Sequence, residues 1–165
     1  MKGREQGFEP VFCAGSRLLI LGSFPSVKSR KEGFYYGNPQ NRFWRTVCGF
    51  FGEDVPKTVE DKRNFLLRRK IALWDVVESC EIEGSSDASI RREKLADLPA
   101  LVKKCGAPVI LCNGRAAYGA IERCYPELLP MAHKLPSTSP ANPRFSFEAW
   151  NSALLEVFPE PHKKS

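Results

Sequence analysis

Two short polar loops contain most of the side chains in this chain that could recognise and orient a polar substrate. The first reads Gly22-Ser-Phe-Pro-Ser26 and follows an apolar run from Leu18 to Leu21. The second reads Leu135-Pro-Ser-Thr-Ser-Pro-Ala-Asn142 and follows a shorter strand-like run. Both loops offer hydroxyls, amides and backbone N–H groups. Such groups bind and orient a substrate, but they do not titrate near neutral pH.

A third group of polar residues lies where the sequence predicts that a helix begins. Asn38 suits an N-cap and Pro39 the first helical position, so we expect a helix over residues 39–51. Asn41 would then lie in the first turn, where backbone N–H groups are unpaired and the helix dipole is positive. The preceding loop, residues 24–37, holds aromatic residues among cations. That mixture is typical of a surface that stacks bases and meets phosphates, with packing beneath the loop as the alternative.

Two further polar residues interrupt or follow apolar runs. Asp75 lies inside the run 71–77, and Asn113 follows the run 108–112. A carboxylate in a buried strand needs a partner or a role, so Asp75 is a candidate site residue. A capped or ion-paired aspartate at a strand end is the alternative. Asn113 could line the floor of a pocket or stabilise a turn.

Several common catalytic arrangements are absent from the sequence. It contains no P-loop, no glycine-rich dinucleotide turn and no Gly-x-Ser-x-Gly elbow. Of the two histidines, His133 lies in a short apolar run and His162 in the tail. The six cysteines lack the close spacing of zinc or iron–sulfur ligands, and we expect them to be small apolar residues without disulfides. We therefore expect no metal and no small-molecule cofactor.

Strand-like and helix-like segments alternate along the chain and must position these loops. We expect strands at about 17–23, 71–77, 108–112 and 131–135. We expect helices at about 39–51, 57–69, 97–105 and 115–124 and from Ser146 onward, with an acidic loop over 78–89. This order predicts an α/β fold with a mostly parallel, four-stranded central sheet and helices on both faces. The loops after the first and fourth strands would then share one edge of the sheet, where α/β proteins build binding crevices.

Length and composition limit the class of protein. A chain of 165 residues with 42% hydrophobic and 27% charged residues is expected to fold as a single globular domain, residues 1–165. The formal net charge of +6 permits a polyanionic partner without requiring one. No apolar run is long enough to span a membrane and residues 1–10 do not read as a signal peptide, so we expect a cytoplasmic protein.

Taken in order, these motifs resemble the uracil-DNA glycosylase superfamily, and most closely its hypoxanthine-DNA (deoxyinosine) glycosylase branch. The resemblance covers residues 17–150 and is specific because several motifs occur in the same order and in the same strand–loop contexts. The stretches that carry it are Gly22–Ser26, Tyr36–Trp44, Ala72–Val77 with Gly84–Asp87, and Leu135–Asn142.

The resemblance implies a three-layer α/β/α sandwich with a short, mostly parallel four-stranded sheet. It implies a monofunctional DNA glycosylase of base excision repair that hydrolyses the N-glycosidic bond of one deaminated nucleotide, most closely deoxyinosine. The base would be flipped out of double-stranded DNA, at a cost of a few kcal/mol, because it cannot be reached inside the stack. We expect the protein to act as a monomer on DNA with a damaged base, away from membranes.

The resemblance also suggests roles for residues. It places the catalytic amide at Asn41, where it would orient water or the glycosidic bond, with Asn38 as the rival. Phe24, which would stack on or wall the base, stands where better-known branches have Asp or Asn. The other base-pocket residues are expected to be Gly22, Ser23, Pro25, Ser26, Tyr36, Asn38, Asp75 and Asn113. Contacts with DNA are expected from Ser137, Thr138, Ser139, Pro140 and Asn142.

Two alternatives stay open because Phe24 replaces the usual acid or amide. In one, the protein is a DNA-binding or damage-sensing module that has lost catalysis. In the other, it is a glycosylase directed mainly at uracil or at a mismatched pyrimidine. Activity on deoxyinosine, deoxyxanthosine and deoxyuridine in one duplex context would separate these alternatives.

Overall fold

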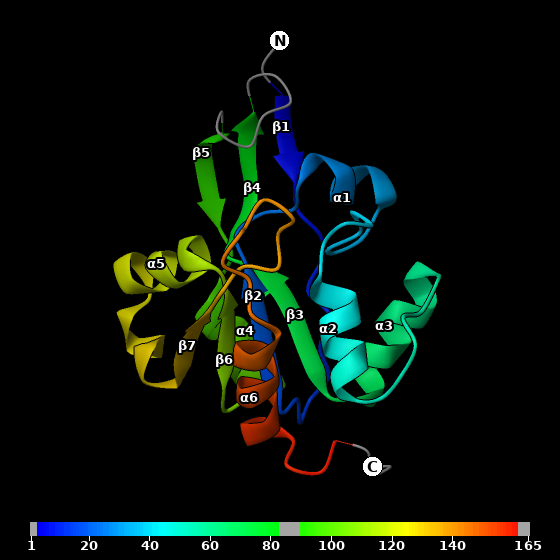
Figure 1. Ribbon diagram of the computed structural model, residues 1–165. Coiled ribbons are helices and arrows are strands. Elements are labelled where there is room, and N and C mark those ends of the chain that lie inside the picture. Colours follow the sequence, from blue (N-terminus) through cyan, green and yellow to red (C-terminus); the bar gives the residue numbers. More distant parts are fainter. Residues whose placement is uncertain (1–2, 83–89, 162–165) are drawn as a thin grey trace.

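The computed structural model describes residues 3–82 and 90–161, which are arranged around one central sheet (Figure 1). Four parallel strands form this sheet in the order β3-β2-β6-β7. The strands predicted from the apolar runs are confirmed. Their bounds are β2 Leu18–Gly22, β3 Ile71–Asp75, β6 Ile110–Asn113 and β7 Ala132–Leu135.

Strand β2 lies inside the sheet and is buried along its whole length. Because side chains alternate along a strand, Leu18 and Ile20 enter the core on one face, while Leu19 and Leu21 enter the core on the other. This two-sided burial explains why β2 reads as a continuous apolar run. The parallel ladder with β3 pairs Gly22 with Asp75, so the two strands end side by side.

Helices cover both faces of the sheet, and the predicted three-layer α/β/α sandwich is confirmed (Figure 1). Helices on one face share a core with Leu18 and Ile20; they are α2 Phe43–Phe50, α3 Val59–Arg68 and α6 Phe147–Val157. Helices on the other face share a core with Leu19 and Leu21; they are α4 Leu98–Cys105 and α5 Arg115–Cys124.

The predicted ends of two helices are confirmed in atomic detail. The Asp97 side chain accepts a hydrogen bond from the third residue of α4, and Gly106 ends that helix at φ +73°. Ser146 accepts a hydrogen bond of 3.1 Å from the backbone of Ala149 at the start of α6. All six cysteines are free, and Cys112 is fully buried as expected, whereas Cys124 is exposed, which differs from the expectation of buried or half-buried cysteines.

A second sheet corrects the expectation of an acidic loop over residues 78–89. Strands β1 Gly3–Gln6, β4 Val77–Ile82 and β5 Ile90–Leu95 form an antiparallel sheet in the order β1-β4-β5. The segment 77–82 is extended because it pairs with the N-terminal strand, a partner too distant in sequence to leave a local signal. Residues 83–89 lie outside the described residues, so that part of the expectation is not addressed.

The segment predicted as a loop over residues 24–37 contains a short helix, α1 Val27–Glu32. Ser26 caps α1 by accepting a hydrogen bond from the backbone of Ser29, and Gly33 ends the helix at φ +85°. A 3-10 helix, η2 Pro126–Met131, precedes β7 and was not predicted either. Short helices of this kind lack the apolar periodicity that makes longer ones visible in a sequence.

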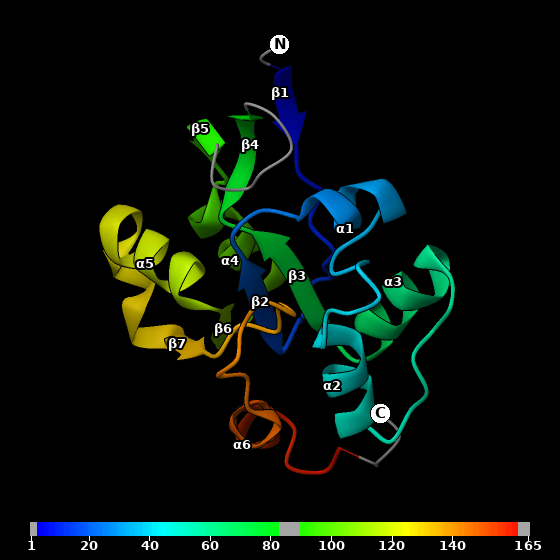
Figure 2. The same ribbon diagram turned by 45° about the horizontal axis from the view of Figure 1, so that its top comes forward.

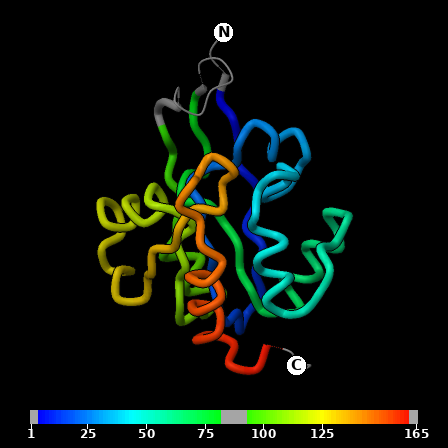
Figure 3. Tube along the Cα trace, viewed as in Figure 1, coloured from blue at the N-terminus to red at the C-terminus, as the bar shows by residue number. Residues whose placement is uncertain are grey.

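The carboxyl ends of the four parallel strands lie at one edge of the central sheet, and the arrowheads of β2 and β3 lie near the middle of Figure 2. The loop after β7, orange in Figure 3, runs along this edge toward the cyan segment that precedes α2. A backbone hydrogen bond of 3.1 Å from Arg42 to Thr138 joins these two segments. Among the described residues, none of the helices has the length and apolar character needed to cross a membrane.

Candidate active site

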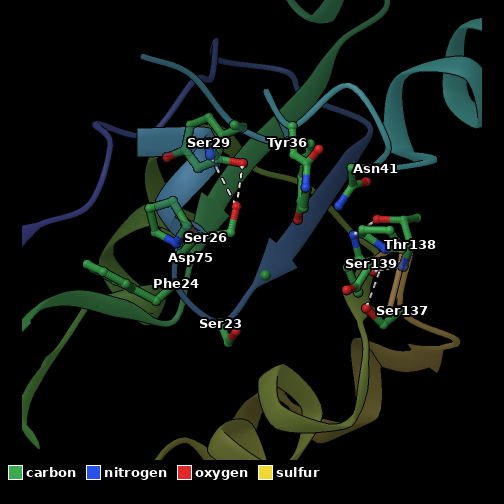
Figure 4. Close-up of a pocket in the computed structure, with 16 residues that line it drawn as sticks. Ser23, Phe24, Ser26, Ser29, Tyr36, Asn41, Asp75, Ser137, Thr138 and Ser139 are labelled. Atoms are coloured by element: carbon green, nitrogen blue, oxygen red, sulfur yellow. Dashed lines mark hydrogen bonds between the residues drawn. The ribbon is translucent and has the colours of Figure 1, made fainter. Parts of the chain in front are cut away.

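A cavity of about 240 Å³ opens at the carboxyl edge of the sheet (Figure 4). Its walls come from the loop after β2, the turn before α2, the ends of β3 and β6, and the loop after β7. Two lining residues, Ser29 and Tyr35, were not predicted from the sequence. The other lining residues were all predicted: Gly22, Ser23, Phe24, Pro25, Ser26, Tyr36, Asn38, Asn41, Asp75, Asn113, Ser137, Thr138, Ser139 and Pro140.

Asn41 does not lie in the first turn of a helix, because α2 begins at Phe43. The expected cap, Asn38, instead accepts a hydrogen bond of 3.0 Å from the backbone N–H of Gln40 and stabilises a turn. The Asn41 side-chain oxygen accepts a hydrogen bond of 2.9 Å from the backbone N–H of Phe43. Figure 4 shows the other end of this amide, its nitrogen, on the cavity side. Asn41 therefore presents an oriented donor to an occupant.

Asp75 forms part of the cavity wall and is only 4% exposed. Burial raises the pKa of its carboxyl to about 7, and the nearby backbone N–H of Gly22 opposes this rise. Its Oδ2 is buried and has no hydrogen-bond partner among the described residues. Asp75 thus ends β3 and is held by the Gly22 backbone, as the alternative of a capped residue at a strand end expects, but its Oδ2 is left unpaired.

Tyr36 is held in an uncommon backbone conformation, with φ +53°. Its ring stacks on Phe43 with the ring centroids 4.2 Å apart, which directs the hydroxyl toward the cavity (Figure 4). Burial raises the pKa of this phenol above its ordinary value, so the hydroxyl is a neutral donor at pH 7. The hydroxyl lies near the Asn113 amide without forming a hydrogen bond, and no described residue pairs with it.

Asn113 holds the loop after β7 in place. Its Nδ2 donates to the Thr138 hydroxyl at 2.9 Å, and its Oδ1 accepts from the Thr138 backbone N–H, also at 2.9 Å. Thr138 is fully buried, so its side chain acts inside the fold. Burial and pairing with Asn113 take up the hydroxyl and the backbone N–H of Thr138, and its expected contact with DNA stays a prediction.

The remaining polar groups of this loop mostly stabilise its own turns. Ser137 accepts a hydrogen bond from the Ser139 backbone at 3.1 Å, and Ser139 accepts one from Ala141 at 3.2 Å. Asn142 donates to the Ser137 carbonyl at 2.9 Å and accepts from the Arg144 backbone at 3.0 Å. Asn142 lies outside the cavity and lines the neighbouring groove, while its amide is used within the loop; its expected contact with DNA stays a prediction.

Arg42 joins the turn before α2 to the loop after β7, a role that sequence reasoning missed. Its guanidinium donates to the carbonyls of Ser139 at 3.3 Å and Asn142 at 3.1 Å. The same guanidinium lies 4.9 Å from the centre of the Phe145 ring. The position of Arg42 inside the Asn-Arg-Phe motif was the only available signal, and it did not distinguish a contact with DNA from a contact with a loop.

The aromatic residues of the segment 24–37 lie in two places: Phe24 lines the cavity, and others pack in the core. The guanidinium of Arg30 lies 5.5 Å from the centre of the Phe24 ring. Phe34 and Tyr35 are 3% and 1% exposed, so the prediction that the aromatic residues form a base-stacking surface is wrong for these two. The alternative, packing beneath the loop, holds for them because they join the core around α2.

A basic groove of about 700 Å³ adjoins the cavity and shares Ser137 and Ser139 with it. Three exposed cations, Arg115, Lys134 and Arg144, line this groove. They come from α5, from β7 and from the segment before α6. No local pattern in the sequence indicates this cluster, because the three residues come together only in the fold. His133, also in β7, is exposed and does not line the cavity.

The fold and the cavity agree with the family to which the chain belongs. Residues 9–159 match the model of the uracil DNA glycosylase superfamily, so the protein is a member of this superfamily. The resemblance inferred from the four motifs is thus confirmed.

Relatives with more specific descriptions cover nearly the whole chain. A protein from Methanosarcina acetivorans described as a hypoxanthine DNA glycosylase is 39% identical over 147 residues, which is 86% of this chain and 90% of the relative. A protein from Methanosarcina barkeri with the same description is 36% identical over 162 residues, or 94% and 98% of the two chains. The solution NMR structure of a candidate uracil DNA glycosylase from Methanosarcina acetivorans matches with a TM-score of 0.79. That match has 36% identity and covers 94% of this chain and 99% of the other.

Proposed function

We propose that this protein is a DNA glycosylase that removes hypoxanthine from deoxyinosine in double-stranded DNA. The observation that carries the proposal is the donor-rich cavity at the carboxyl edge of the sheet, in a chain similar over most of its length to two hypoxanthine DNA glycosylases. The cavity receives the flipped nucleotide, because the glycosidic bond of a stacked base is out of reach.

Asn41 is the residue we assign to the reacting centre. An amide does not ionise near neutral pH, so it orients groups and does not act as a base. Since its oxygen is held by Phe43, its NH2 group is left to donate to the attacking water or to the nucleotide. This fixed orientation places the reactants without further loss of conformational freedom during the reaction.

Charge stabilisation provides the rest of the catalysis in this proposal. The bond between C1′ of the sugar and N9 of the purine breaks with its electron pair moving to the base. Donors aimed at the departing base therefore lower the barrier. Removing one such donor from a comparable site raises the barrier by roughly 2.7–4 kcal/mol. The neutral hydroxyl of Tyr36 is one such donor. Phe24 contributes an apolar wall and excludes water.

The basic groove is the path that we assign to the DNA backbone. Its cations lie beside the loop that forms one wall of the cavity, so a strand could occupy both at once. Phosphate binding by Arg and Lys releases counterions, and it carries no sequence information by itself. That suits a protein that must find a damaged base in any sequence context.

The experiment that tests the function compares base release from duplexes that differ only in one base. Hypoxanthine, xanthine and uracil are placed at the same position, in EDTA, and abasic sites are revealed by alkali. We expect fastest cleavage at deoxyinosine. Preference for deoxyuridine would support a uracil-directed enzyme. Salt-sensitive binding without an abasic site on any of the three substrates would support the non-catalytic module. This alternative is tested because Phe24 replaces the usual acid or amide of the first motif.

A further inference from the structure

Two residues of the cavity wall each have one buried polar side-chain atom without a hydrogen-bond partner among the described residues. These atoms are Oδ2 of the Asp75 carboxyl and the oxygen of the Tyr36 hydroxyl. A buried polar group without a partner costs about 1–3 kcal/mol of stability. Native proteins contain few of them, and a bound ligand is one physical reason for their presence.

Gly22 brings the two groups to the same place. A Cβ added to Gly22 would lie 2.5 Å from Asp75 Oδ1 and 2.7 Å from the Tyr36 hydroxyl. Only a residue without a side chain allows both groups to approach the end of β2 so closely. The Gly22 N–H beside the carboxyl favours an unprotonated oxygen there, so the proton of the neutral acid belongs on Oδ2.

The negative charge on the departing base determines whether the carboxylate or the neutral carboxyl of Asp75 suits the reaction. A purine that leaves with the electrons of its glycosidic bond carries negative charge, and a carboxylate in the same dry cavity would repel it. A neutral carboxyl instead carries no charge and has a proton to donate from Oδ2. Hypoxanthine presents acceptors at its carbonyl oxygen and at ring nitrogens, and these acceptors strengthen as the base departs.

We propose that Asp75 is a catalytic acid, which delivers the Oδ2 proton to hypoxanthine as the base leaves. This inference rests on the proposed function. The bond between C1′ and N9 breaks, with its electron pair going to the base. The base takes the proton from Asp75 and leaves as neutral hypoxanthine. Water forms the new bond to C1′ and releases a proton to solvent, and Asp75 regains a proton from solvent after the base has left.

The surroundings of Asp75 favour its neutral form. The ionisable groups that its charge affects are the phenols of Tyr36 and Tyr35, and burial raises the pKa of both. Both phenols are therefore neutral at pH 7, and neither stabilises a carboxylate as a cation would. Burial raises the pKa of Asp75 to about 7, so the acid is partly protonated at neutral pH. At higher pH the proton is lost and the remaining charge opposes departure of the base.

The experiment measures single-turnover release of hypoxanthine, at saturating enzyme, from well below to well above pH 7. The wild-type rate is expected to fall above pH 7 by about tenfold for each pH unit, because one essential proton is lost. Asp75→Asn keeps a donor of the same shape but has no proton to transfer. It is expected to be slower at low pH, to lack this fall, and to approach or exceed the wild-type rate at high pH.

Three outcomes are distinguishable. A wild-type rate that is flat or rises through pH 7 would overturn the role of Asp75 even if the variant did not fold. Parallel pH profiles for wild type and Asp75→Asn would also overturn it, and both results would leave the glycosylase function intact. A wild-type protein that releases no hypoxanthine at any pH would overturn the function, and the inference with it. Thermal unfolding of both proteins at each pH separates loss of folding from loss of chemistry.

Discussion

Asn113 and Thr138 exchange two hydrogen bonds of 2.9 Å across the edge of the sheet, although they are 25 residues apart in the chain. Asn113 ends β6, and Thr138 lies in the loop after β7. The pair fixes this loop on the end of the neighbouring strand, and Thr138 is completely buried as a result. One wall of the cavity is therefore attached to the end of the sheet.

Removing the Thr138 hydroxyl should loosen this wall. In Thr138→Val the side-chain amide of Asn113 loses an acceptor inside the protein, so we expect a loss of about 1–3 kcal/mol in the free energy of unfolding. Urea denaturation of wild type and variant measures this difference in the free energy of unfolding. Ser152→Ala, at an exposed position of α6, is the control and should change stability by less than about 0.5 kcal/mol. Equal stability of the two variants would contradict the role of the pair.

Arg42 should matter for the rate of base release because it connects two walls of the cavity. Arg42→Ala removes donors from the carbonyls of Ser139 and Asn142 and the contact with Phe145. Displacement of a wall by about 1 Å can reduce the rate on the order of a hundredfold, and we expect an effect of that size. Single-turnover kinetics with Arg45→Ala, an exposed arginine on α2, provides the comparison. If both variants kept the wild-type rate, Arg42 would have no positioning role.

The cations of the basic groove should govern affinity for DNA and its dependence on salt. Changing Arg115, Lys134 or Arg144 to Ala should reduce the slope of log K against log salt by about 0.9 for each phosphate that the variant no longer neutralises. The rate of base release at saturating enzyme should change little. Lys103→Ala, an exposed change on α4 that does not line the groove, should keep the wild-type slope. Unchanged slopes in all three groove variants would exclude this groove as the path of the backbone.

Asp75 should make the stability of the protein depend on pH. Burial raises its pKa to about 7, whereas an unfolded aspartate titrates near about 3.9. The folded state thus binds the proton more tightly, so stability is greatest below about pH 4 for this group and declines as pH rises toward 7. Asp75→Asn removes the effect, and it should raise the melting temperature more at pH 8 than at pH 5. The same change in melting temperature at both pH values would contradict a buried, titrating Asp75.

The central sheet could be predicted because its signals are local. Leu18 to Leu21 form an apolar run that ends at a glycine, and Asp97 and Gly106 mark the ends of a helix with a cap and a turn residue. These features depend on residues near one another in the chain. The candidate cavity followed from the same logic, since parallel strands bring the loops after them to one edge.

What the sequence did not reveal depends on contacts between distant segments. Residues 77–82 form a strand because they pair with residues 3–6, and neither segment has a sequence pattern that indicates its partner. The helix predicted from residue 39 begins at Phe43, because Asn38 stabilises a turn of its own. Pro39 suited a helix start but also suited that turn. Sequence pattern alone could not decide between the two.

The same reason limited the assignment of side chains in the site. Asn113 and Thr138 each had a polar group suited to a ligand, but the two groups satisfy each other in the fold. Asp75 was a candidate because a carboxylate inside an apolar strand needs a partner. Its Oδ2 has no partner in the described part of the chain, which could be learned only from the surroundings of that atom.

The most direct test of this account is release of hypoxanthine from a duplex with one deoxyinosine, by wild type and by Asn41→Ala. With Asn64→Ala, an exposed change on α3, as control, we expect base release by wild type and control in EDTA. Loss of one oriented donor should slow Asn41→Ala on the order of 10²–10³-fold with its fold intact. Equal rates for all three proteins would contradict the role of Asn41, and no release by the wild type would contradict the proposed function.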